Sequence, residues 1–311
     1  MKKIVAVTGS NGFIGSQIVQ GFEKIEQYQV LPIARNTVDL LSDEEVLDFF
    51  AKNKVDTIIH CASTGGSRKD NGKTTILQNN LRMFFNLERC LKPGMTLINF
   101  GSGAQYNKNR NLVDINEEAF GEAVPQDEYG FGKYIMSKYI NQFQESKHTG
   151  KIYNLVLFGV YGKGEDYTYR FISNAIIKNL LHMPIVINQN VLFHYLYIDD
   201  LVRVLKYLLE EQWNEKEFNV TPKQSISLIQ TAEIINDISD YHSEIIVKNR
   251  GMNYQYTGNN QRLMDCIGED FEFTSYEEGI RQLYFYYKER LDSLDLDSVR
   301  EDAYIQFCKN T

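Results

Sequence analysis

The chain has 311 residues, of which 43% are hydrophobic, so it can bury the core of one large domain or of a large domain with a smaller one, and a disordered chain is excluded. A formal net charge of −8 and the lack of a Lys/Arg-rich run argue against a surface for nucleic acid or anionic membranes, and neither is expected as a partner. The four cysteines lie far apart, and no apolar run is long enough for a signal segment or a bilayer span. We therefore expect a cytoplasmic protein with neither a metal site nor a disulfide framework.

The first half of the chain alternates short apolar runs rich in β-branched residues with helical stretches. Strands are expected at residues 3–8, 30–34, 57–61, 96–101 and 153–158, and helices at residues 13–25, 44–53, 76–91 and about 128–146. The strands are apolar throughout rather than alternating, as happens when helices cover both faces of a parallel sheet. This predicts an α/β fold with a doubly wound parallel sheet, the Rossmann fold.

The order of elements changes after residue 162. Further helices are expected at residues 170–181, 201–212 and 227–239, with a strand at 184–187 and an aromatic stretch at 191–198. We predict a large domain at residues 1–162, a smaller α+β region at 163–290 from which about 191–212 returns to the core, and a charged peripheral tail at 291–311. The smaller region would lie over the carboxyl ends of the strands, where such sheets bind ligands.

The first predicted strand leads into a glycine-rich turn that opens the first predicted helix. The turn has Gly-x-x-Gly-x-x-Gly spacing and consists of Thr8, Gly9, Ser10, Asn11, Gly12, Phe13, Ile14 and Gly15. Glycine lets the backbone approach a pyrophosphate, whose charge the helix N-terminus stabilises. We predict a dinucleotide site here; the alternative is a glycine-rich turn without a ligand.

The end of the second predicted strand indicates which dinucleotide binds. About twenty residues beyond the glycine turn, where an NAD enzyme has an acidic residue for the ribose 2′-hydroxyl, this chain has Arg35. A guanidinium pairs with a 2′-phosphate, whereas a carboxylate repels it. Arg35 therefore favours NADP(H), unless it is a solvated arginine at a strand end.

Three residues form a candidate catalytic set. Ser102 follows the strand at 96–101, and Tyr129 and Lys133 are four apart on one predicted helical face. Hydride transfer to or from a carbinol carbon needs a proton moved at the oxygen, and a lysine ammonium one turn away would stabilise a tyrosine phenolate. Ser102 would hold the substrate oxygen against the tyrosine hydroxyl. The alternative is an ordinary amphipathic helix.

Together these residues resemble the extended short-chain dehydrogenase/reductase family, in its nucleotide-sugar epimerase, dehydratase and reductase branch, over nearly the whole chain. The resemblance includes an aromatic-Val-Asp-Asp strand end at residues 195–201 and a C-terminal signature at residues 276–280. It implies further cofactor-binding residues beside the glycine turn and the catalytic pair. These are Asp39 and Leu40 near the adenine, Cys61, Ala62 and Ser63 at the adenosine ribose, the structural Asn80, and Phe158 and Val160 beside the nicotinamide.

Within the branch, residues 30–62 are most similar to GDP-fucose synthase. That enzyme's epimerising cysteine falls on Ala104 and its partner histidine on about Gly164, and neither residue can move a proton from carbon. The Thr-Asp-Glu of the 4,6-dehydratases falls on Ser102, Gly103 and Ala104, so the carboxyl groups for water elimination are missing as well.

Substrate binding is expected at Ser102, Gly103 and Ala104. The family arginine that grips the nucleotide falls on Phe193, so Arg170 and Arg262 are candidates for that task, although each can instead be a surface or structural arginine. His60 lies inside an apolar strand and is expected to be a core histidine with a hydrogen-bond partner rather than a ligand.

The sequence thus predicts an NADPH-dependent reductase of the C4 keto group of a nucleotide-linked 4-keto-6-deoxy sugar, in the biosynthesis of a surface-polysaccharide deoxysugar. One alternative is a 4-epimerase that keeps a bound NAD, and another is a non-catalytic cofactor-sensing protein on the same fold. In the resembling family, the helices expected here at 76–91 and 128–146 form a dimeric four-helix bundle. A homodimer is therefore expected.

Overall fold

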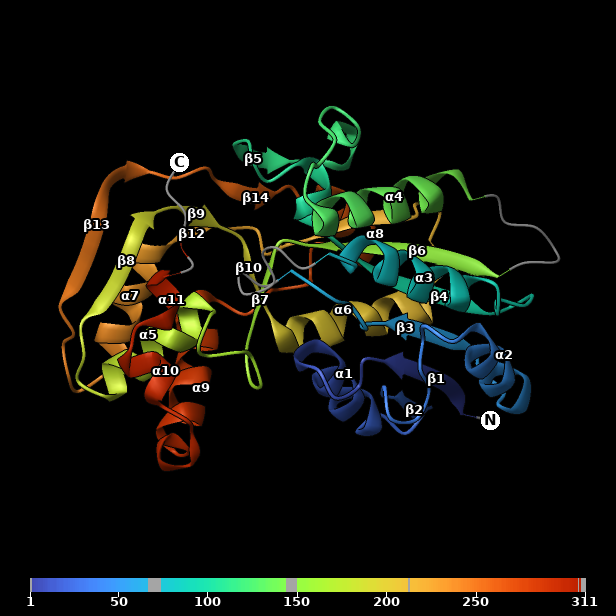
Figure 1. Ribbon diagram of the computed structural model, residues 1–311, viewed down its shortest axis with the longest axis horizontal. Coiled ribbons are helices and arrows are strands. Elements are labelled where there is room, and N and C mark those ends of the chain that lie inside the picture. Colours follow the sequence, from blue (N-terminus) through green and yellow to red (C-terminus); the bar gives the residue numbers. More distant parts are fainter. Residues whose placement is uncertain (1, 67–73, 144–149, 212, 307, 309–311) are drawn as a thin grey trace.

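The computed structural model describes residues 2–66, 74–143, 150–211, 213–306 and 308. A large domain contains the central sheet and its helices, and a smaller region lies at its side, toward the left of Figure 1. Every helix in the described residues is too short or too polar to span a bilayer.

The central sheet has six strands, all paired in parallel. In spatial order they are β2 (Tyr28–Ile33), β1 (Lys3–Thr8), β3 (Thr57–His60), β4 (Thr96–Ser102), β6 (Lys151–Leu157) and β11 (Glu217–Val220). The strand order reverses between β1 and β3, and the connections on either side of that point leave in opposite directions. Sheets of this kind bind ligands at such a point, here the carboxyl ends of β1 and β3. The predicted doubly wound α/β fold is confirmed.

Helices cover both faces of this sheet. α1 (Phe13–Glu23) and α6 (Ile198–Glu210) lie on one face, and α2 (Asp43–Lys52), α3 (Ile76–Glu88) and α4 (Glu128–Gln142) lie on the other (Figure 1). Neighbouring strand residues point into opposite cores: Val5 and Val7 pack with α1 and α6, whereas Ala6 packs with α2 and α3. Because both sides are buried, each strand needs an unbroken apolar run, as the sequence has.

The smaller region is built on a parallel strand pair. β8 (Ile185–Asn190) pairs with β13 (Ile245–Met252), and α5 (Phe171–Leu180), α7 (Leu228–Ile238) and α9 (Tyr276–Lys288) pack beside the pair. Sequence analysis does not predict β13, because its apolar run has only three residues, 245–247, and the polar residues that follow are mostly exposed.

A small mixed sheet joins the two regions. Its strands, in spatial order, are β12 (Ile226–Ser227), β9 (Leu192–Phe193), β14 (Tyr256–Gly258) and β5 (Leu112–Ile115). The expected continuous stretch at residues 191–198 is divided into β9 and β10 (Tyr195–Tyr197), which pairs with β7 (Gly159–Tyr161). The division falls at His194, whose ring contacts the backbone of Gly258 on β14.

The last elements differ from the expected outline in two places. The helix expected to reach residue 146 ends at Gln142, and residues 144–146 lie outside the described residues. The tail is not peripheral over its described part. Val299 on α10 (Asp297–Arg300) and Tyr304 on α11 (Ala303–Gln306) are buried in the core of the smaller region, and Asp302 pairs with the buried Lys178 at 2.5 Å. Two apolar side chains among the charges are enough to dock this segment.

Candidate active site

The glycine turn lies at the carboxyl end of β1 and has the compact form that the motif predicts. Gly9 adopts φ +63°, and a Cβ at this position would stand 2.8 Å from the backbone of Ala62. A Cβ on Gly15 would stand 2.2 Å from the carbonyl oxygen of Gly9. Both glycines are therefore required by close backbone approach, which packs the turn against the loop that follows β3.

The residues of this turn fit a bound anion. Gly12 caps α1 without a side-chain hydrogen bond, and the first turn of α1 has no acidic residue. The hydroxyl of Ser10 is buried without a hydrogen-bond partner in the described residues. Free helix N–H groups and an unpartnered hydroxyl beside a glycine cradle are the donors that a pyrophosphate needs.

Arg35 is exposed just after β2, in a turn closed by the Thr37 hydroxyl against the backbone of Ala34. The part of the chain that the structure describes has no carboxylate in an ion pair with Arg35. Its charge is thus available to a ligand phosphate. Asp39 accepts a hydrogen bond from the backbone of Leu41, and Leu40 is buried.

The loop after β3 is fixed by two polar side chains. Asn80 holds Thr64 with a pair of 2.8 Å hydrogen bonds, one to its N–H and one from the asparagine amide to its carbonyl. The Thr8 hydroxyl accepts from the N–H of Ala62 and pairs with Nδ1 of His60 at 2.9 Å. Burial lowers the pKa of His60 to about 3, so it is a neutral core histidine, as expected. Asn80 therefore acts on the loop that carries Cys61, Ala62 and Ser63.

The three candidate catalytic side chains gather at the end of β4. Ser102 accepts a hydrogen bond from the N–H of Ala104 at 3.2 Å, and Tyr129 lies close enough to Ser102 for the serine hydroxyl to affect its pKa. The Nζ atom of Lys133 lies 5.7 Å from the centre of the Tyr129 ring and donates to the carbonyl of Phe100 at 2.6 Å. Asp127 caps α4 by accepting from the N–H of Gly130, which fixes the start of the helix that carries Tyr129 and Lys133.

Burial sets the charge states of this pair. It raises the pKa of Tyr129 above its ordinary value, and the hydrogen bond with Ser102 and the charge of Arg170 oppose the change only in part. Burial also lowers the pKa of Lys133 to about 8. The Lys133 ammonium is bonded to Phe100 and is not among the groups that shift the Tyr129 pKa here, so the expected lowering of that pKa by Lys133 stays a prediction.

The residues expected to touch the substrate lie in different surroundings. Gly103 and Ala104 are both buried in the short 3₁₀ turn η2 (Gly103–Tyr106). Neither has a side-chain functional group, because glycine has no side chain and alanine has only a methyl group. Arg170 is exposed at the start of α5, and its charge lies close enough to lower the pKa of both Tyr129 and Tyr256. Of the two arginines considered, only Arg170 has a charge that affects the pKa of Tyr129.

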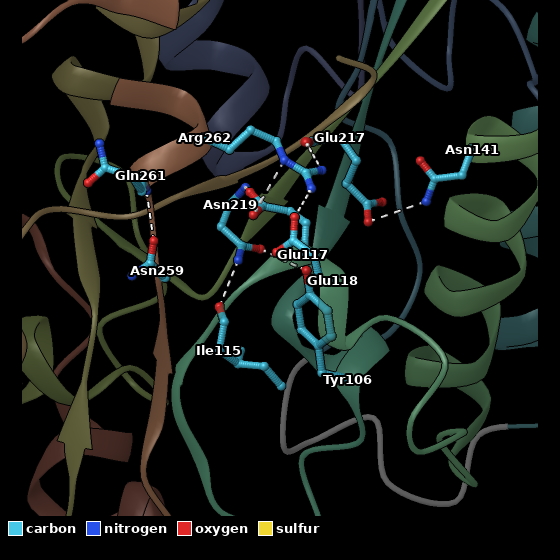
Figure 2. A network of polar contacts seen from close by, with 10 residues as sticks. All are labelled: Tyr106, Ile115, Glu117, Glu118, Asn141, Glu217, Asn219, Asn259, Gln261 and Arg262. Atoms are coloured by element: carbon cyan, nitrogen blue, oxygen red, sulfur yellow. Dashed lines mark hydrogen bonds and ion pairs between the residues drawn. The ribbon is translucent and has the colours of Figure 1, made fainter. Parts of the chain in front are cut away.

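Arg262 has another role than the one expected. On α8 (Gln261–Ile267), it pairs with Glu118 at 2.6 Å and with the buried Glu117 at 3.8 Å, and it donates to the carbonyl of Glu217 at 3.2 Å (Figure 2). Asn219 joins the same network by donating its N–H to Glu117. Three contacts within the protein occupy this guanidinium, so it ties α8 to β11 and to the turn η3 (Glu117–Ala119) rather than standing free for a nucleotide.

Aromatic rings form one wall beside Ser102. Phe158 stacks on Tyr106 at 6.2 Å and packs against Tyr256 at 5.1 Å. Val160 on β7 is partly buried and pairs with Leu196. The ring of Phe158 is thus engaged in an aromatic cluster at the nicotinamide end of the expected site.

Sequence reasoning missed Tyr256. Its Oη lies 3.5 Å from Oγ of Ser102, although it is 154 positions away in the chain. The three-residue strand β14 that carries it has no recognisable period, and the chain contains 20 tyrosines, so no sequence signal marks this one.

A family model described as the NAD dependent epimerase/dehydratase family matches residues 5–221, well over half of the chain. The chain belongs to this family. The matched segment begins in β1 and contains the glycine turn, Ser102, Tyr129 and Lys133. The family match therefore includes the residues of the candidate site.

Known members of the epimerase/dehydratase family resemble the chain along nearly its whole length. ADP-L-glycero-D-manno-heptose-6-epimerase of Brachyspira hyodysenteriae is 26% identical over 309 residues, covering 90% of this chain and 96% of the relative. The crystal structure of a GDP-L-fucose synthetase from Naegleria fowleri has a TM-score of 0.79 at 16% identity, with 94% of each chain covered. MlghC, a GDP-mannoheptose C4 reductase from Campylobacter jejuni with NADP bound, has a TM-score of 0.73 at 17% identity and covers 92% of this chain and 98% of its own.

The resemblance to nucleotide-sugar enzymes of the short-chain dehydrogenase/reductase type is thereby confirmed. The protein is an enzyme of the NAD(P)-dependent epimerase, dehydratase and reductase family, and its homologues include proteins named for nucleotide-linked sugars.

Proposed function

We propose that this protein uses NADPH to reduce the C4 keto group of a nucleotide-linked 4-keto-6-deoxy sugar. The observation that carries the proposal is a serine–tyrosine pair at the end of β4 followed by residues that cannot move a proton from carbon. Tyr129 lies beside Ser102, and the two positions after the serine are the buried Gly103 and Ala104. Such a site can serve a carbonyl oxygen, but it lacks a carbon acid/base pair beside the serine.

A bound NADP(H) would supply the hydride, and residues along the carboxyl edge of the sheet would hold it. The glycine turn and the N-terminus of α1 would hold the pyrophosphate, and the free charge of Arg35 would pair with the 2′-phosphate. Cys61, Ala62 and Ser63 would border the adenosine ribose, with Asp39 and Leu40 near the adenine. Phe158 and Val160 would line the nicotinamide end.

Tyr129 is suited to donate a proton. Because burial raises its pKa, its hydroxyl stays protonated at neutral pH and can give its proton to the oxygen of a carbonyl that is being reduced. Ser102 would hold that oxygen, and Lys133 would stabilise the phenolate left behind once its ammonium leaves Phe100. Arg170 would contact the nucleotide-sugar near the two tyrosines.

The proposal is tested by incubating the purified protein with NADPH and 4-keto-6-deoxy sugars linked to GDP, CDP, dTDP and UDP. We expect loss of absorbance at the dihydronicotinamide band with at least one of them, and a weaker response when NADH replaces NADPH. No cofactor consumption with any of the four sugars would contradict the proposal, and a preference for NADH would remove the role of Arg35.

A second candidate is an epimerase that keeps its cofactor bound and oxidises and reduces the same carbon. The 26% identity to a heptose-6-epimerase over 90% of the chain favours it. Such an enzyme would copurify with oxidised cofactor and convert one nucleotide-sugar into its epimer with no net change in absorbance. Chromatography of the reaction products distinguishes the two candidates.

A further inference from the structure

Tyr256 is fixed with its hydroxyl directed at the catalytic serine. Strand β14 lies between β9 and β5, and its Tyr256 pairs with Phe193 on one side and with Leu112 on the other. The carbonyl of Tyr256 also accepts a hydrogen bond from the N–H of His194. Two segments of the chain, β5 and β9 with the adjoining His194, therefore hold this residue while its Oη reaches to 3.5 Å from Oγ of Ser102.

The residues around the Tyr256 ring leave room for it. Tyr256 packs on Phe158 at 5.1 Å and on Phe193 at 6.0 Å, so its apolar part is covered. A Cβ on Gly103 would stand 2.6 Å from the Phe158 ring and 2.8 Å from Oη of Tyr256. The residue after the catalytic serine must be glycine for the phenol to reach this position.

Ser102 has little hydrogen-bonding capacity left for Tyr256 once it binds a substrate oxygen. A hydroxyl has one proton and two lone pairs, and the N–H of Ala104 takes one lone pair. The substrate oxygen would take the proton, so one lone pair remains for Tyr256, whose Oη is 3.5 Å away, at the outer limit of a hydrogen bond. A closer partner on the sugar would therefore draw this phenol away from the serine.

We propose that Tyr256 is a specificity-determining residue that binds the sugar hydroxyl next to the reacting carbonyl. The inference rests on the proposed function. In a 4-keto-6-deoxy sugar, the two neighbours of C4 are C3, which carries a hydroxyl, and C5, which carries a methyl group. Only the C3 hydroxyl offers a hydrogen-bonding partner to a phenol displaced from Ser102, and a buried phenol left unpaired would disfavour a sugar without it.

The test compares the wild type with Tyr256→Phe on two substrates, the accepted 4-keto sugar and its 3-deoxy analogue. We expect Tyr256→Phe to lower kcat/KM by about tenfold on the sugar that has the hydroxyl and to change it little on the 3-deoxy analogue. NADPH binding, followed by cofactor fluorescence, should stay unchanged. Tyr254→Phe is the matched control, because this tyrosine precedes β14 and its side chain is 47% exposed.

Two results would overturn this inference and leave the proposed function standing. In the first, the wild type is active and Tyr256→Phe has the same kcat/KM as the wild type on both substrates. In the second, Tyr256→Phe lowers kcat/KM by the same factor on both substrates. The second result would mean that the Tyr256 hydroxyl helps to position Ser102 but does not bind the sugar hydroxyl. A wild type that is inert with every 4-keto sugar, while still binding NADPH, would instead overturn the proposed function and this inference with it.

Discussion

Burial acts in opposite senses on the two ends of the Tyr-x-x-x-Lys pair. It raises the pKa of Tyr129 and lowers that of Lys133 to about 8, since in each case the charged form loses its hydration. The motif identified the two side chains correctly as neighbours. It could not show that the Lys133 ammonium is bonded to the carbonyl of Phe100, because that contact depends on a strand 33 positions away.

Replacing Tyr129 by Phe removes the proposed proton donor and keeps the ring that packs beside Gly66. We expect turnover to fall by about 10²-fold or more with NADPH affinity nearly unchanged. Steady-state kinetics together with a fluorescence titration of the cofactor check both parts. Full activity in Tyr129→Phe would show that another group supplies the proton.

Glu165 provides a pH-dependent prediction. Burial raises its pKa to about 7, and the hydrogen bond from Ser173 and the charge of Arg170 oppose this only in part. The folded protein therefore retains a proton that the unfolded chain loses near its ordinary pKa of 4.5, and stability decreases as the pH rises from about 4.5 to 7.

Glu165→Gln keeps the shape of this side chain and removes its titration. We expect the variant to gain stability relative to the wild type as the pH rises through that range, by up to about 3 kcal/mol in the free energy of unfolding. Urea denaturation at pH 4.5 and pH 8 measures the difference. An equal difference at both pH values would contradict the assignment.

At the scale of elements, the sequence predicted the parts whose patterns are long. Five of the six strands of the sheet and its covering helices follow from continuous apolar runs and amphipathic periods, and the glycine turn follows from its spacing, whereas the four-residue strand β11 was not predicted. The elements β5, β9 and β14 have only two to four residues each, which is too short for any period to show. These strands position Tyr256. For this reason the sequence indicated candidate site residues on the large sheet and its helices but did not indicate Tyr256 on the small sheet.

The first turn of α1 gives a prediction about an element's end. Gly15→Ala would place a methyl group 2.2 Å from the carbonyl oxygen of Gly9, so the turn must open. Its N–H groups would then no longer point toward a bound phosphate. We expect NADPH affinity to weaken by about tenfold or more. Gly132→Ala is the control, since its Cβ would make an ordinary 3.4 Å contact with Leu77. Unchanged affinity in Gly15→Ala would argue against a phosphate site here.

At the scale of the whole molecule, α3 and α4 present aromatic rings on one side of the large domain. Phe85 and Tyr139 are partly buried and lie 5.1 Å apart, with Phe143 packed 5.9 Å from Tyr139. These are the two helices for which a four-helix bundle between two copies was expected. The observed cluster supports a homodimer as our proposal.

Phe85→Glu tests that assembly by placing a charge within the cluster. We expect the wild type to have about twice the chain mass of 36.1 kDa and Phe85→Glu to have the mass of one chain. Light scattering after gel filtration measures both. Phe285→Glu is the control, because this ring is 46% exposed on α9, far from the proposed interface. A monomeric wild type would rule out the dimer.

The small sheet that joins the two regions also has a mechanical consequence. Because β14 is paired with β5 on one side and with β9 on the other, the strand that carries Tyr256 lies where the two regions meet. A rotation of one region against the other would therefore move Tyr256 relative to Ser102. A sugar bound between these two side chains would couple the choice of substrate to the relative position of the two regions.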